Sequence, residues 1–223
     1  MNPKKPENQV VSKKRVADHG EVYTASREVN AMLDLVKQET ERIDSRFLEP
    51  ACGTGNFLAE VLRRKLNVVK DRYGKTQLEY ERYAVLAVSS IYGIDILEDN
   101  VIQCRKRLFE IFNENYVSLF KSKCQDECNT SIRFILDKNI IWGDALTLKS
   151  VCGNLLPIVF SEWSPVNGSM IKRRDFTMVN LVNTHACYDN EPNLFSDLGE
   201  SVAIPKPIKE YPLIHFLRLA DAE

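Results

Sequence analysis

The loop at residues 49–57 constrains the fold of this chain more than any other segment. Its sequence is Glu-Pro-Ala-Cys-Gly-Thr-Gly-Asn-Phe, and it lies between a short apolar segment and a segment with helical apolar spacing. Glycines in such a connection let the backbone adopt φ values closed to other residues and pass close under a ligand. The loop therefore predicts a nucleotide-type turn between a strand and a helix.

The segments around this loop alternate between a helical pattern and an extended pattern of apolar residues. Apolar residues at helical spacing, with Ser26 as the first N-cap, predict helices at residues 26–36, 57–69, 78–89 and 99–116. β-branched and apolar runs predict extended segments at residues 46–49, 91–96, 132–136, 140–142 and 157–160. This alternation predicts an α/β fold, with a mostly parallel sheet and helices on both faces.

The 223 residues are enough for one large domain. We expect a mobile polar N-terminus at residues 1–15, a main domain at 16–160 and an irregular C-terminal extension at 161–223. The sequence has no run of eighteen apolar residues, and its first fifteen residues are polar and rich in lysine. These features predict a cytoplasmic protein.

Charge and cysteine content limit the classes of partner. The formal net charge is -1, so a surface for nucleic acid would have to be local or be supplied by another chain. The cluster Lys172, Arg173 and Arg174 is the candidate for phosphate contact, with ordinary solvated surface as the alternative. Cys124 and Cys128 lack a second pair or a nearby histidine, so we expect free thiols and no metal site.

The residues of the loop discriminate between ligands. Leu58 stands where a dinucleotide-binding loop has its third glycine. Glu49, at the end of the preceding strand, would repel a phosphate but suits a ligand that carries an ammonium or a sulfonium group. The loop therefore favours S-adenosylmethionine over NAD, and a tight turn without ligand is the alternative.

Two further acids follow predicted strands. Asp95 ends the strand at residues 91–96, where a carboxylate can accept hydrogen bonds from both ribose hydroxyls of an adenosine. Asp144 follows Gly143 after the strand at 140–142, and it could accept a hydrogen bond from an adenine amine. Since an open α/β sheet binds its ligand at the carboxyl ends of its strands, the three acids predict one site.

Four segments together resemble the adenine-specific DNA methyltransferases of bacterial restriction-modification systems, in the motif order of the gamma class. Residues 49–58 resemble motif I, residues 19–24 the motif upstream of it, residues 92–96 motif II and residues 143–145 motif III. The resemblance implies a Rossmann-like class I methyltransferase fold, S-adenosylmethionine as cofactor and adenine in duplex DNA as substrate. The cofactor-binding residues that it implies are Tyr23, Thr24, Glu49, Pro50, Ala51, Gly53, Gly55, Asn56, Phe57, Asp95, Ile96, Asp144 and Ala145.

The sequence departs from this family at the catalytic motif, Asn/Asp-Pro-Pro-Tyr/Phe. No Pro-Pro pair occurs anywhere in the chain, and the C-terminal part is shorter than the family's. By position, Glu162 could accept from an amine and Trp163 could stack on a flipped base, although a surface turn is the alternative for this segment. We therefore expect a DNA adenine methyltransferase, or its cofactor-binding part, with a divergent catalytic loop or one supplied by another chain.

The alternative is a catalytically inactive accessory protein of a restriction or phage-defence complex. A methyltransferase for RNA, protein or a small molecule is a third hypothesis, which the motif at residues 19–24 disfavours.

Overall fold

A computed structural model describes residues 13–19, 21, 22, 24–151, 153, 155–182 and 205–221. Its helices are α1 (Lys13–His19), α2 (Ser26–Asp34), α3 (Lys37–Thr40), α4 (Asn56–Tyr73), α5 (Gln77–Ser89), α6 (Glu98–Phe120), α7 (Asp126–Asn139) and α8 (Met178–Val182), with short 3-10 turns at η1 (Lys121–Lys123) and η2 (Phe216–Asp221). Its strands are β1 (Phe47–Glu49), β2 (Ile91–Asp95), β3 (Ile140–Asp144), β4 (Lys149–Ser150), β5 (Val159–Val166), β6 (Met170–Thr177), β7 (Lys209–Glu210) and β8 (Ile214–His215).

The first sheet has the order β1-β2-β3-β4, which is also the order along the chain. β1, β2 and β3 are parallel, and β4 pairs antiparallel with β3. Helices connect the parallel strands, so the prediction of an α/β fold with a mostly parallel sheet is confirmed. The predicted strands at 46–49, 91–96 and 140–142 correspond to β1, β2 and β3.

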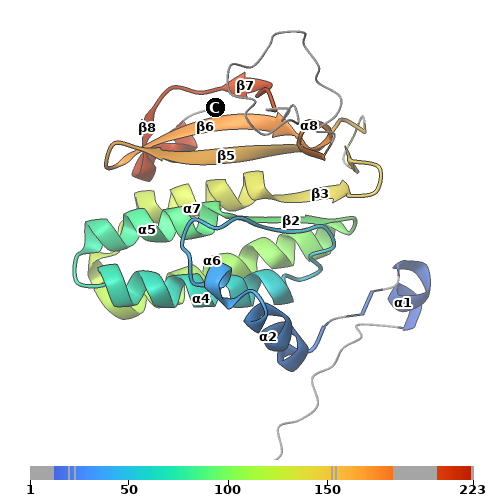
Figure 1. Ribbon diagram of the computed structural model, residues 1–223, viewed down its shortest axis with the longest axis horizontal. Coiled ribbons are helices and arrows are strands. Elements are labelled where there is room, and N and C mark those ends of the chain that lie inside the picture. Colours follow the sequence, from blue (N-terminus) through green and yellow to red (C-terminus); the bar gives the residue numbers. More distant parts are fainter. Residues whose placement is uncertain are drawn as a thin grey trace, which may run out of the picture.

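The two faces of this sheet are covered differently. On one face, Ile91 and Ile140 share a buried cluster with Leu58 of α4 and Leu108 of α6. On the other face, Tyr92 and Ile94 pack against β5 and the start of α8 through the cluster Tyr92, Ile94, Ile158, Phe160 and Met178. Figure 1 shows the resulting layers, with α4 and α6 on one side of β2 and β3, and β5 and β6 on the other. The prediction of helices on both faces is therefore wrong for most of the second face.

The second sheet is antiparallel, and it occupies much of residues 161–182 and 205–221, where we expected an irregular extension; residues 183–204 of that extension lie outside the described residues. β5 and β6 form a hairpin in register from Val159↔Thr177 to Val166↔Met170, and β7 and β8 both pair with β6. Asn167 and Gly168 lie in the hairpin turn with positive φ values of 42° and 72°. An Asn-Gly pair is a strong hairpin signal, so the sequence contained a clue to this element.

The segment at residues 132–136 is helical, not extended as predicted. It lies within α7, where Ile132, Ile135 and Leu136 are buried on one face. Their spacing of three and one residues fits one face of a helix. A short apolar run fits a strand equally well, so the sequence of this segment does not distinguish a helix from a strand. The N-terminal boundary also differs, because Arg15 lies in α1 and bonds to Glu21, Asp99 and Asn100.

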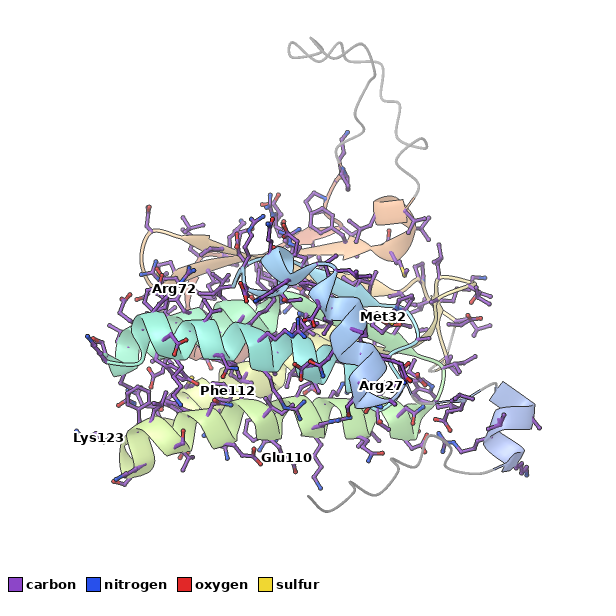
Figure 2. All side chains as sticks on the ribbon, turned by 60° about the horizontal axis from the view of Figure 1, so that its bottom comes forward. Arg27, Met32, Arg72, Glu110, Phe112 and Lys123 are labelled. Carbon is purple, nitrogen blue, oxygen red and sulfur yellow. The ribbon has the colours of Figure 1, made fainter. Side chains whose placement is uncertain are left out.

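The helix α6 illustrates how the first layer is built. Phe112 is fully buried on the side of α6 that faces α4, and Glu110 on the same helix points away to solvent (Figure 2). This amphipathic spacing is what the sequence predicted for residues 99–116. In the described part of the chain, no helix combines the length and the apolar character that crossing a membrane requires.

Lys65 of α4 ties together the chain at the start of β1 and β2. It is fully buried, and its Nζ donates to the backbone oxygens of Ile43 (3.1 Å) and Ser45 and to Ser90 Oγ (2.6 Å). An ammonium group has three donors, so all of them are satisfied. Burial lowers the pKa of Lys65 from its ordinary value of 10.5 to about 7.

This lysine gives a prediction for the pH dependence of stability. Between about pH 7 and pH 10.5 the unfolded state binds the Lys65 proton more tightly than the folded state, so the free energy of unfolding rises with pH across this window. In Lys65→Met this contribution is absent. We expect the stability of the native protein, relative to that of Lys65→Met, to increase from pH 7 to pH 10 in urea titrations. A difference that stays constant over this range would contradict the prediction.

Candidate functional site

The glycine loop connects β1 to α4 with the backbone conformation that its sequence predicts. Gly53 and Gly55 have φ values of 51° and 81°, in the left-handed region that favours glycine. A Cβ atom on Gly55 would lie 2.6 Å from Cys104 Sγ of α6. Both conformation and packing therefore require glycine at position 55, and Pro50 and Ala51 before it are exposed.

Asp95 is the residue that joins the second strand to this loop. Its side chain accepts hydrogen bonds from the backbone N–H of Gly53 (2.8 Å) and of Leu97 (2.9 Å), and from Asn100 Nδ2 (3.2 Å). The residue is 8% exposed. A carboxylate offers about four acceptor positions, so one remains for a ligand hydroxyl. Asp95 thus fixes the loop, and in this structure it can accept from one ribose hydroxyl rather than, as the sequence predicted, from both.

Glu49 lies at the carboxyl end of β1, directly before the loop, and pairs in register with Gly93 of β2. Partial burial raises the pKa of its carboxyl group, and a hydrogen bond from the Ala51 backbone opposes this shift. Among the described residues Glu49 has no ion-pair partner, and a half-buried carboxylate of this kind gains from a positively charged ligand. This environment fits an ammonium or sulfonium group better than a phosphate.

The segment upstream of β1 is held against the loop by two asparagines. Asn56 Nδ2, at the start of α4, donates to the Thr24 carbonyl (3.2 Å), and Asn100 Nδ2 donates to Glu21 Oε1 (2.7 Å). Asn56 Oδ1 also accepts a hydrogen bond from Arg107. The structure therefore brings Thr24 and Asn56 together as expected, whereas Tyr23 lies outside the described residues.

Sequence reasoning did not single out Arg15, Glu21 or Asn100 as part of this site. Arg15 bonds to Glu21 and Asp99, and the bond from Arg15 lowers the pKa of Asp99. Glu21 lies inside the upstream motif, so its acidic side chain was an available signal. Arg15 and Asn100 belong to none of the four motifs, and the bonds that place them at this site join segments about 80 residues apart, Arg15 to Asp99 and Asn100 to Glu21.

Asp144 is the last residue of β3, and Ala145 follows it at the same sheet edge. Asp144 is half-buried, and its carboxylate accepts from the backbone N–H of Leu146 (2.9 Å) and from Thr147 Oγ1 (3.0 Å). These bonds lower the pKa of Asp144 and fix a local turn. Ile96 is 49% exposed after β2, and its carbonyl accepts from Trp142 Nε1 (3.0 Å). Phe57 is half-buried at the start of α4.

The two weak catalytic candidates lie in β5, within a strand and not in a loop or turn. Trp163 is 5% exposed, its Nε1 donates to Asn139 Oδ1 (2.9 Å), and its ring packs against Phe134. Glu162 forms ion pairs with Arg46 (2.5 Å) and Arg174 (2.6 Å). A buried indole cannot stack on a base, and a carboxylate held by two guanidinium groups is a poor acceptor for an amine. Both assignments are therefore wrong.

The basic cluster at residues 172–174 is also not a free cationic surface. Arg173 is 4% exposed and forms an ion pair with Asp175 (2.9 Å), with its guanidinium over the Tyr211 ring. Lys172 pairs with Glu210 (3.0 Å) on β7, and Arg174 pairs with Glu162. Alternation along β6 turns Arg173 inward, so the predicted phosphate contact fails for this residue.

The structure thus gathers the glycine loop, Glu49, Asp95 and the Thr24 backbone at one edge of the parallel sheet, with Asp144 at the end of the neighbouring strand β3. Within the described ranges, no group of three or more histidine, cysteine or acidic side chains could hold a metal ion. Comparison of the chain with models of protein families, with curated proteins and with solved structures finds no match.

Proposed function

We propose that this chain binds S-adenosylmethionine in a Rossmann-like methyltransferase fold and forms the cofactor-binding part of an adenine-specific DNA methyltransferase of a restriction-modification system. The observation that carries the proposal is the contact between Asp95 and Gly53, which joins an acidic strand end to a glycine loop in left-handed conformation. Ligands of open α/β sheets bind at such strand ends. The resemblance of four sequence segments to this family supplies the identity of the cofactor.

The acids around the loop support a cationic cofactor. Glu49 is half-buried and forms no ion pair within the described ranges, and Asp95 keeps one acceptor position. Residues Glu49, Gly53, Gly55, Asp95 and the Thr24–Asn56 pair would hold the cofactor. Bound S-adenosylmethionine would supply an electrophilic methyl group for transfer.

Methyl transfer to DNA needs groups that the described residues do not offer at this site. Because Trp163 is buried and Glu162 is paired, we propose that the catalytic loop is divergent and outside the described residues or is supplied by another chain, and that duplex DNA is bound with the help of such a chain. The alternative is an inactive accessory protein of a restriction or phage-defence complex, which the same two side chains favour equally.

Calorimetry on the purified chain tests the cofactor proposal. We expect S-adenosylmethionine to bind with a dissociation constant of about 1–100 μM, that is about −8 to −5 kcal/mol. NAD at equal concentration is the matched control, since Glu49 should repel its pyrophosphate. Absence of heat with S-adenosylmethionine, or equal heat with NAD, would refute the proposal.

Transfer of a tritiated methyl group to mixed-sequence duplex DNA separates the two functional alternatives. We expect no incorporation by this chain alone and incorporation when the chain that carries the catalytic loop is added. Incorporation by this chain alone would exclude both the accessory role and the need for a second chain.

A further inference from the structure

β1 is the last strand on one side of the parallel sheet, and its outer edge is unpaired. The Phe47 N–H donates to the Ser90 carbonyl (2.9 Å), so residues 47 and 49 bond to β2. In a parallel ladder the groups of the intervening residue point the other way. The N–H and C=O of Leu48 therefore face outward, and β1 pairs with no other strand of the described chain.

A cavity of about 490 Å³ adjoins this edge. Its walls include Leu48 of β1, Phe160 of β5, Phe176 of β6, and Met178 and Leu181 of α8. Leu48 and Leu181 are 49% and 40% exposed. An edge strand that is protected against pairing carries charge or is covered, whereas this edge borders an apolar hollow large enough for several side chains.

The rim of the cavity has an excess of positive charge. Arg46 and Arg174 both pair with Glu162, so two guanidinium groups share one carboxylate. Arg174 Nε is buried and makes no hydrogen bond within the described chain. A second carboxylate at the rim would reach the exposed part of the Arg174 side chain rather than this buried Nε, and it would balance the charge.

We propose that the outer edge of β1 docks one extended segment of another polypeptide chain. Backbone groups of the incoming segment pair with Leu48, its alternate apolar side chains enter the cavity, and an acidic side chain meets Arg174. Strand addition of this kind takes affinity from backbone bonds and specificity from pockets for alternate side chains.

The topology of the sheet favours a parallel orientation for this segment. The strand order follows the chain order, so the first sheet as described has no point at which the order reverses. Ligands of open α/β sheets bind at such a reversal. A parallel strand beside β1 would create such a reversal of the strand order next to the glycine loop. The carboxyl end of the incoming strand would then lie beside Glu49.

The test uses the full chain and a synthetic capped hexapeptide, Thr-Glu-Thr-Val-Thr-Val, whose glutamate shares one face with the two valines. Nuclear magnetic resonance of backbone amides is the readout. We expect the Phe47 and Glu49 signals to shift and saturate with a dissociation constant of about 1 mM, and exchange of the Leu48 amide with solvent to slow. Leu48→Pro should weaken binding at least tenfold, since proline removes the outward N–H and the leucine side chain of the cavity wall, and it is tolerated on an edge strand. Arg174→Gln should weaken binding of this peptide but not of its glutamine analogue.

Three outcomes would overturn the docking proposal. The Leu48 amide could already be protected in the free chain, which would mean that the chain covers its own edge. The peptide could leave the β1 signals unchanged at several times the expected dissociation constant, or it could bind Leu48→Pro equally well. Urea unfolding and calorimetry with S-adenosylmethionine on Leu48→Pro serve as controls, so a failed cofactor proposal and a failed docking proposal give different results.

Discussion

Asp95→Ala is expected to lower the affinity for S-adenosylmethionine by at least tenfold, and to destabilise the fold. The carboxylate holds the Gly53 and Leu97 N–H groups and Asn100. Each buried donor left without a partner costs about 1–3 kcal/mol, and a hydrogen bond from a ligand to a charged group contributes about 1.5–3 kcal/mol. Calorimetry measures the first effect, and urea unfolding without cofactor measures the second.

Two variants that each replace a carboxylate by an amide of similar shape test whether the position of the lost negative charge matters for cofactor binding. Asp95→Asn keeps most of the shape and one acceptor, whereas Glu110→Gln removes a negative charge from an exposed site on the outer side of α6 (Figure 2). We expect Asp95→Asn to weaken cofactor binding and Glu110→Gln to leave it unchanged. Equal binding by Asp95→Asn and the native chain would remove Asp95 from the cofactor site and leave it as a support of the loop.

Gly55→Ala is expected to reduce the free energy of unfolding by about 2–5 kcal/mol. The residue has φ +81°, which costs an alanine about 1–2 kcal/mol. The new Cβ would also lie 2.6 Å from Cys104 Sγ, and overpacking of this kind costs about 1–3 kcal/mol. Because α4 begins directly after Gly55, the same change should also weaken cofactor binding.

Gly168→Ala is the control for backbone strain alone. Gly168 has φ +72°, but nothing lies within 4 Å of its added Cβ. Its substitution should therefore cost only about 1–2 kcal/mol. The second control is Cys104→Ala, which removes the clashing sulfur. If the cost of Gly55→Ala stays the same in the Cys104→Ala background, contact with Cys104 is not its cause.

The first two-thirds of the fold followed from local patterns. The strands before Glu49 and Asp95 and the helices around them have apolar periodicities that fit one type of element over many residues. The glycines at 53 and 55 marked a turn that only a left-handed backbone can make, and both residues have that conformation. The prediction of a strand at residues 132–136 was wrong because a run of five mostly apolar residues fits a helix and a strand alike. Contacts of α7 with the rest of the core decided between them.

The sequence by itself determined the parallel sheet, the glycine loop and the placing of Glu49 and Asp95 at its carboxyl edge, because strand ends and turns are encoded by neighbouring residues. Only the tertiary structure decided which residues far apart in the chain pair with each other and which side chains are buried. It paired Glu162 with Arg46, buried Trp163 against Asn139 and turned Arg173 inward. It also placed β1 at the end of the sheet, with no further strand beside it among the described residues. These outcomes depend on which face of each strand meets the core, and that is settled by long-range packing rather than by local sequence.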